Sequence, residues 1–64
     1  MKNRLRELRE EKGLTQKELA KQLNMSQTGY SKYETGENDI STRILIILAE
    51  LYEVSVGYLL GVED

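Results

Sequence analysis

The chain has 64 residues, which is the size of one small domain, and it contains neither cysteine nor histidine. This composition excludes disulfides, thiol chemistry and the usual zinc and imidazole sites. The formal net charge of −2 hides a division, because residues 1–32 carry +4 and residues 33–64 carry −6. A dipolar domain of this kind can turn its basic half toward a polyanion such as nucleic acid. The alternative is that the charged residues only solvate a small surface.

No apolar run approaches the ~20 residues that span a membrane, and the N-terminus lacks the apolar region of a signal peptide. The absence of cysteine is compatible with a reducing cytoplasm. We therefore expect a cytoplasmic protein that contacts no membrane. Nothing in the sequence indicates a cofactor, a metal ion or a small-molecule ligand.

Residues 1–12 are predicted to form a charged helix with Leu5 and Leu8 on its apolar side. Gly13 follows as the left-handed residue that ends such a helix. Arg9 comes directly after Leu8, where the inward stripe of the helix should run.

Residues 15–34, TQKELAKQLNMSQTGYSKYE, are predicted to form two short helices separated by a sharp turn. Thr15 and Glu18 have the spacing of a capping box at the start of the first helix. Asn24 suits the left-handed conformation that the turn requires, and Ser26 suits the cap of the second helix. The apolar stripe of the first helix consists of Leu19, Ala20 and Leu23.

The second of these helices leaves four polar side chains outward, Gln27, Thr28, Ser31 and Lys32, if Tyr30 and Tyr33 mark its inward face. A helix-turn-helix places such a helix in the major groove of DNA. Glutamine suits adenine, lysine suits guanine and a threonine methyl can meet a thymine methyl. We therefore predict base contacts from Gln27, Thr28 and Lys32. Tyr30 needs an outlet for its hydroxyl, which a phosphate or water at the domain edge would supply.

Ser41 is predicted to cap a fourth helix that ends near Tyr52, and Ser55 and Gly61 to bound a short last helix. The fourth helix is apolar on two sides. Its core stripe should consist of Leu45, Leu48, Ala49 and Tyr52. A second stripe consists of Ile44, Ile47 and Leu51. A domain this small cannot cover both, so we predict that a partner subunit covers the second stripe.

Residues 14–37, LTQKELAKQLNMSQTGYSKYETGE, resemble the lambda-repressor and Cro-like helix-turn-helix family, the XRE type of bacterial or phage regulator. RLRELREEKG before them and LAELYEVSVGYLLG after them also match, so the resemblance covers nearly the whole chain. It implies a compact all-α fold of five helices, with residues 1–64 as one DNA-binding domain and the motif at about 15–34. It also implies a sequence-specific transcriptional regulator that binds a palindromic double-stranded operator as a two-fold homodimer. Of the two modes of regulation, it favours repression over activation.

The resemblance further implies roles for single residues. Members of the family pair an arginine at the position of Arg9 with a glutamate at that of Glu34, beneath the motif. The glutamine that matches Gln16 touches a backbone phosphate and braces the first glutamine of the reading helix, which is Gln27 here. Relatives use the last helix in the two-fold interface, so Tyr58 joins the second stripe of the fourth helix as an interface residue.

The loop after the motif often carries basic residues in the family, whereas Glu37 and Asp39 are acidic here. This departure leaves Asn38 and Arg43 as the predicted contacts of this region with the DNA backbone. Ser31 and Gln16, within the motif, are the other predicted backbone contacts.

A protein-interaction module or antitoxin on the same fold is the alternative function, working through the acidic C-terminal half and the fourth helix. An enzyme is the weakest interpretation, because no cleft is evident that would perturb the remaining ionisable groups.

Overall fold

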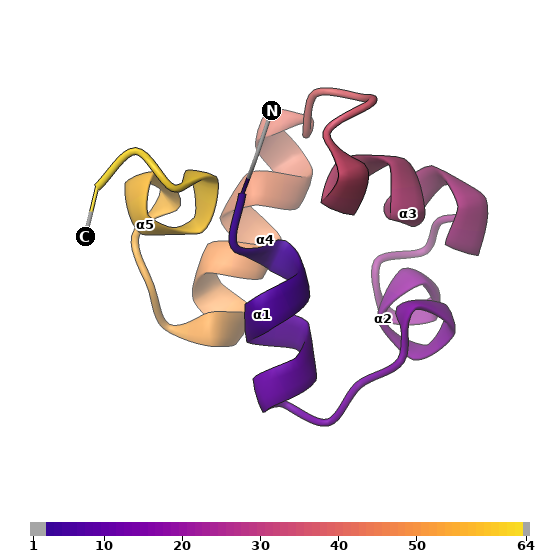
Figure 1. Cartoon of the computed structure of the whole chain (residues 1–64). Helices are drawn as coiled ribbons and strands as arrows, with labels where there is room; N and C mark the ends of the chain where they lie inside the picture. The colour runs from indigo at the N-terminus through magenta and orange to yellow at the C-terminus, as the bar shows by residue number, and fades with distance from the viewer. Residues whose placement is uncertain (1–2, 64) are drawn as a thin grey trace.

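The computed structural model describes residues 3–63, and Figure 1 shows its helices in chain order. They are α1 (Leu5–Glu11), α2 (Gln16–Gln22), α3 (Gln27–Thr35), α4 (Thr42–Tyr52) and α5 (Val56–Leu60). This part of the chain contains no strand, so the predicted all-α fold is confirmed. The first helix was predicted over residues 1–12, and within the described residues it runs from Leu5 to Glu11; its predicted start at residue 1 lies outside them.

Hydroxyl side chains cap the helices from α2 to α5, as predicted. Thr15 accepts a hydrogen bond from the Glu18 backbone N–H at 3.1 Å, and the Glu18 carboxylate accepts one from the Thr15 N–H at 2.9 Å. The other three caps each accept from the backbone N–H three residues later, and they are Ser26, Ser41 and Ser55. Each cap satisfies a backbone donor that the first helical turn leaves free, which fixes where the helix begins.

Left-handed residues end the helices. Asn24 has a φ of 60° in the turn between α2 and α3, and Gly13 has a φ of 71° after α1. Glu53 also adopts a left-handed conformation, with a φ of 55° at the end of α4, which the sequence did not predict. A β-carbon makes this conformation uncommon for a glutamate, so the sequence carried no local signal for it.

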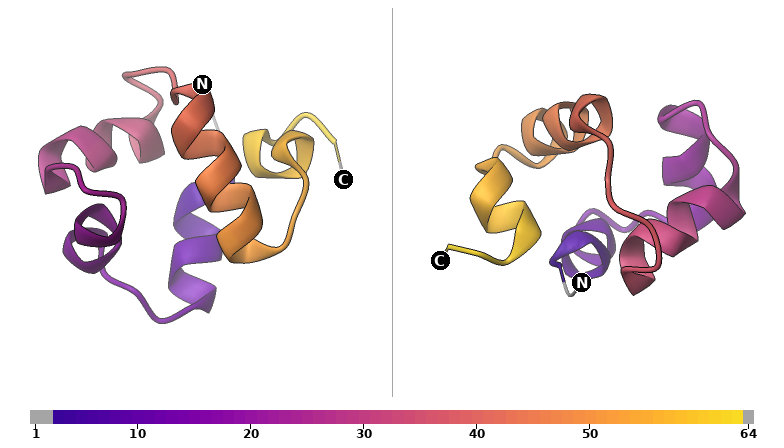
Figure 2. Two further views of the ribbon diagram at one scale, coloured as in Figure 1. Left: turned by 180° about the vertical axis from the view of Figure 1, so that it is seen from behind. Right: turned by 90° about the horizontal axis from the view of Figure 1, so that it is seen from above.

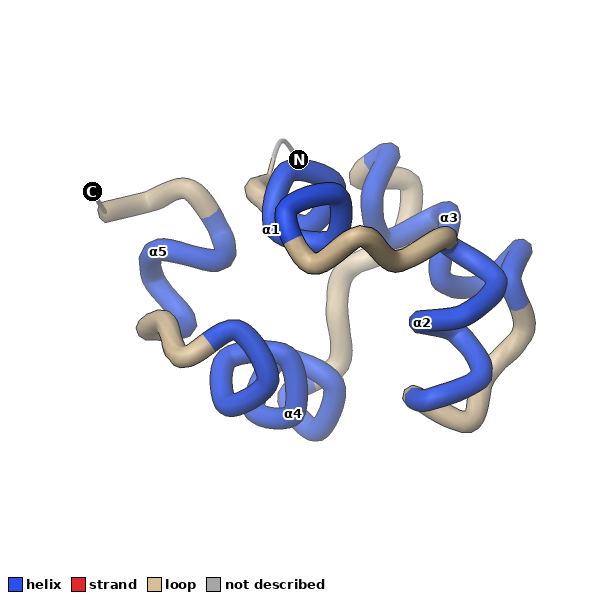
Figure 3. The backbone as a smooth tube through the Cα atoms, turned by 90° about the horizontal axis from the view of Figure 1, so that it is seen from below, coloured by secondary structure: helices blue, strands red, loops and turns tan. Residues whose placement is uncertain are grey.

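One core receives buried apolar side chains from every helix. Figures 2 and 3 show how the helices are arranged around a common centre. In the view from below, α1 and α4 lie on opposite sides of this core, with α5 at one end and the α2–α3 pair at the other. The buried residues are Leu5, Leu8, Leu19, Ala20, Leu23, Tyr30, Ile44, Leu48, Tyr52 and Leu59. The Cα radius of gyration is 10.5 Å, so every helix has one side on this core and another at the surface.

The orientation of α4 differs from the prediction. Ile44, which we placed on the outer stripe, is 3% exposed and belongs to the core with Leu48 and Tyr52. Leu45, which we placed in the core, is only half-buried. Residues at i, i+4 and i+8 share one face, so the core face is rotated from the predicted one by about one residue position. Because α4 is apolar on nearly all sides, its sequence does not define which face turns inward.

The environment of Tyr30 also corrects the prediction. Its side chain is 0% exposed, so its hydroxyl does not reach a phosphate or bulk water at the domain edge. Within residues 3–63, the buried hydroxyls of Tyr30 and Tyr52 make no hydrogen bond of ordinary geometry. Burial raises the pKa of Tyr30 above its ordinary value and raises the pKa of Tyr52 to about 12. Both tyrosines therefore remain neutral core residues at physiological pH.

Arg4 joins the beginning of the domain to its end. Its backbone N–H donates to the carbonyl of Leu59 at 3.0 Å, and its guanidinium lies 4.2 Å from the centre of the Tyr58 ring. The same guanidinium donates to the carbonyls of Tyr58 and Glu63. The Glu63 carboxylate accepts a hydrogen bond from Ser55, the cap of α5. These contacts hold the five-residue α5, which is too short to be stable alone.

Candidate nucleic-acid interface

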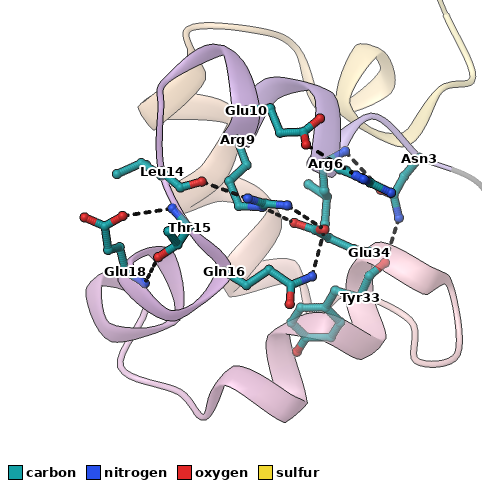
Figure 4. Close-up of polar contacts among 11 residues, drawn as sticks. Asn3, Arg6, Arg9, Glu10, Leu14, Thr15, Gln16, Glu18, Tyr33 and Glu34 are labelled. Atoms are coloured by element: carbon teal, nitrogen blue, oxygen red, sulfur yellow. Dashed lines mark hydrogen bonds and ion pairs between the residues drawn. The ribbon is translucent and has the colours of Figure 1, made fainter.

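A partly buried ion pair fixes α3 against α1. Figure 4 shows Arg9 reaching from α1 to Glu34 on α3, with Nε to Oε2 at 2.6 Å and Nη2 to Oε1 at 3.3 Å. The two side chains are 11% and 4% exposed. The remaining amino group of Arg9 donates to the Leu14 carbonyl at 2.7 Å. One guanidinium therefore orients α1, the entrance to α2 and the last turn of α3.

Gln16 completes this cluster from the first turn of α2. Its side-chain nitrogen donates to Glu34 Oε1 at 3.0 Å, so the hydrogen bond of Gln16 goes to Glu34 rather than to Gln27. Burial alone would raise the pKa of the Glu34 carboxyl, but hydrogen bonds, first of all that from Arg9, hold this pKa below its ordinary value. Glu34 is therefore ionised at neutral pH, and we refer to Arg9, Gln16 and Glu34 as the ion-pair cluster.

The outward face of α3 is polar and accessible. Gln27, Thr28 and Lys32 are exposed and Ser31 is half-buried, whereas Tyr30 points into the core. The four outward side chains line one hollow, together with two residues from neighbouring elements, Gln16 and Glu37. The structure thus brings together all three predicted base-contacting residues and two of the predicted backbone contacts. We call these six residues the reading surface.

Two predicted backbone contacts lie apart from the reading surface. Asn38 is exposed in the loop after α3 and lines a different hollow, beside Ile40 and Leu45. Arg43 is exposed in the first turn of α4, and it lies one helical turn before the outward Ile46 and Ile47. Residues three and four apart are neighbours on a helix, so Arg43 borders the apolar face of α4.

The structure also adds a residue that sequence reasoning did not select. Lys17 is exposed on α2 and lines a hollow shared with Thr15, Gln16 and Gln27 at the beginning of α2. Backbone N–H groups at a helix start favour an anion, and a lysine beside them adds a positive charge. The signal that the sequence offered was its place directly after Gln16, at the start of a helix.

Residues 3–63 contain no group of three or more histidine, cysteine, aspartate or glutamate side chains that could hold a metal ion. None of the helices that they form is both long enough and apolar enough to cross a membrane.

A sequence model of the helix-turn-helix family matches residues 5–59, and the chain belongs to this family, as the resemblance implied. The HTH-type transcriptional regulator ImmR of Bacillus subtilis (strain 168) is 44% identical over 61 residues, covering 95% of this chain and 48% of ImmR. The uncharacterized HTH-type transcriptional regulator YobD of the same strain is 41% identical over 61 residues, covering 95% and 54%. The HTH-type transcriptional activator BcrR of Enterococcus faecalis is 36% identical over 61 residues, covering 95% and 30%. The chain therefore spans about half the length of ImmR and YobD, and less of BcrR.

Proposed function

We propose that this chain binds double-stranded DNA sequence-specifically and regulates transcription, with α3 as its reading helix. The observation that carries the proposal is the reading surface, where Gln27, Thr28 and Lys32 stand exposed on a helix whose other side is buried. The ion-pair cluster supports it, because a side chain can select a base only if its helix is held in a fixed orientation. Relatives that are named transcriptional regulators add support.

The proposed binding divides the contacts between backbone and bases. Gln16 and Lys17 lie at the beginning of α2, where helix N–H groups favour phosphate, and would position the domain on the duplex. Gln27, Thr28 and Lys32 would then reach base edges in the major groove. Ser31 is half-buried between them and would contact the backbone.

The protein would act as a two-fold dimer on a palindromic operator. Ile47 is 36% exposed and Ile46, which sequence reasoning did not select, is 50% exposed on the same side of α4. Leu51, one helical turn after Ile47, is half-buried, and so is Tyr58 on α5, whose ring stacks on the Arg4 guanidinium. A two-fold contact through it would place two copies of α3 about 34 Å apart, in successive major grooves. Occupying an operator that overlaps a promoter would repress transcription without any further surface.

The test is selection of bound fragments from a pool of random duplex DNA. We expect enrichment of a palindrome with half-sites about one helical turn apart. A single enriched half-site would support base readout by a monomer and contradict the dimer. Recovery of an unenriched pool would contradict sequence-specific binding altogether.

Base readout predicts the effect of single substitutions on the selected site. Gln27→Ala or Lys32→Ala should weaken binding by ~1–3 kcal/mol, and only on sequences that carry the selected base. Fluorescence anisotropy with the selected duplex and single-base variants would measure this. Gln22→Ala and Lys12→Ala change exposed residues of the same types outside the reading surface, and serve as matched controls. An equal loss on every sequence would show phosphate contact instead of base readout.

Protein docking is the second candidate function, and the exposed Ile46 and Ile47 are the observation that favours it. An antitoxin or interaction module would use this face and the acidic C-terminal half to bind a different protein. Salt separates the two candidates. Binding to phosphates weakens steeply as salt rises, whereas apolar docking does not.

A further inference from the structure

Glu37 lies on the reading surface although it follows α3 rather than belonging to it. Its exposed side chain lines the hollow formed by Gln16, Gln27, Thr28, Ser31 and Lys32, and it is the only carboxylate among those lining residues. Whatever occupies this hollow must therefore meet a negative charge as well as the Lys32 ammonium. A phosphate would be repelled there, so the carboxylate needs a hydrogen-bond donor as its partner.

The backbone on both sides of Glu37 is attached to the last turn of α3. The Thr35 hydroxyl donates to the Lys32 carbonyl at 3.2 Å and accepts from the Glu37 N–H at 3.4 Å. The Asn38 N–H donates to the same Lys32 carbonyl at 3.2 Å. The backbone of Glu37 is thus attached to the end of α3, so its side chain would approach a groove together with the reading helix.

The chemistry of the major groove restricts what a carboxylate can select. An ionised carboxylate only accepts hydrogen bonds, and cytosine presents its N4 amino group as a donor there. Guanine and thymine present acceptors, which would leave the carboxylate desolvated and unpaired. Adenine presents a donor with an acceptor beside it. Lys32 has the opposite preference, because an ammonium suits the O6 and N7 acceptors of guanine.

We infer that Glu37 is a specificity-determining residue, which accepts a hydrogen bond from the N4 amino group of a cytosine at or directly beside the base pair that Lys32 contacts. This inference rests on the proposed DNA-binding function. It assigns a base-reading role to a position where charge alone would predict only repulsion. The discrimination arises from the wrong bases as much as from the right one, because guanine and thymine leave the desolvated carboxylate without a partner and adenine places its N7 acceptor beside its amino donor.

The test compares selections from random duplex DNA by the full chain and two variants. Glu37→Gln keeps the shape of the side chain but removes its charge. Glu53→Gln removes the same charge from an exposed residue in the α4–α5 connection, at the opposite end of the domain from α2 (Figure 1). We expect the wild type and Glu53→Gln to enrich the same cytosine, and Glu37→Gln to lose about tenfold of its preference for it.

Two other outcomes are informative. If Glu37→Gln binds every sequence more tightly by the same factor and keeps the selected cytosine, Glu37 only repels phosphates, and the inference is overturned while the proposed function stands. If the wild type enriches no sequence, the proposed function fails and this inference fails with it. Measuring the affinity of both variants for one unselected duplex separates the first outcome from a change in base preference.

Discussion

All the helices share one apolar core, but the two halves of the domain differ in the contacts that are added to it. Between α1, α2 and α3 the decisive contacts are directional, because Arg9, Gln16 and Glu34 each have hydrogen-bond partners at defined distances. Between α4 and the rest they are apolar, through buried residues such as Ile44 and Leu48. Hydrogen bonds specify orientation, whereas apolar packing accepts several orientations at similar free energy.

This difference matches the two roles that we propose, base readout by α3 and contact between subunits through α4. The half with directional contacts carries the reading surface, where the position of each side chain must be fixed. The apolar half carries the exposed Ile46 and Ile47, which suit a contact between subunits that depends on buried area. The predictions below test each half in turn, beginning with the largest expected effect.

Breaking the ion pair should destabilise the domain most. Arg9→Ala or Glu34→Ala should each lower the free energy of unfolding by about 3–5 kcal/mol, because the surviving partner is left buried without its counter-charge. Urea denaturation followed by circular dichroism would measure this.

The exposed pair of Arg6 and Glu10 provides the control for this prediction. Their atoms are 3.5 Å apart and the side chains are 73% and 56% exposed, so Arg6→Ala should change the free energy of unfolding by at most about 0.5 kcal/mol. A double-mutant cycle on Arg9 and Glu34 that shows no coupling energy would contradict the role of the pair.

The apolar half should respond according to which face of α4 is changed. Ile44→Ala should lower the free energy of unfolding by about 2–5 kcal/mol, because it removes buried methyl groups from the core.

Ile47→Lys should leave the monomer folded, because the side chain is already 36% exposed. Equilibrium sedimentation should show that Ile47→Lys weakens a dimer that the wild type forms at micromolar concentration. A wild type that stays monomeric there would remove the proposed interface, and a variant that unfolds would place Ile47 in the core.

The smallest effect that we predict is on pH dependence. The pKa of Glu34 is lower in the folded domain than the ordinary glutamate value of about 4.3, so its contribution to stability is complete above that pH. It is lost as pH falls below about 4.3 and through the lower folded pKa. Unfolding measured from pH 7 to pH 2 should therefore depend less on pH in Glu34→Gln than in the wild type. Equal curves for Glu34→Gln and the wild type would contradict this origin.

Much of the fold could be predicted because its signals are local. Thr15 and Glu18 identify the start of α2 by their own spacing, and Asn24 identifies the turn after it. A cap needs only neighbouring residues, so a single sequence contains all the information required. The partner of Arg9 lies 25 residues away, and only the resemblance to a family suggested it.

The features that the sequence did not reveal depend on contacts between distant elements. The core face of α4 is set by the helices around it, and a helix with apolar residues on nearly all sides has no polar face to mark its orientation. The inward direction of Tyr30 was predicted, but the complete burial of its hydroxyl depends on the core that all the helices share. Glu37 joins the reading surface through the path of the loop after α3, whereas its charge alone suggested a lost contact.

The contacts of Arg4 hold the beginning and the end of the domain close together. Its guanidinium reaches carbonyls that lie 54 and 59 residues further along the sequence, so the two ends of the domain meet at one corner. In the unfolded chain the radius of gyration would grow from 10.5 Å to about 24 Å, and these ends would separate by several tens of ångströms. A pair of fluorescent labels on the two ends would therefore start close together, and energy transfer between them would report directly on the opening of the domain.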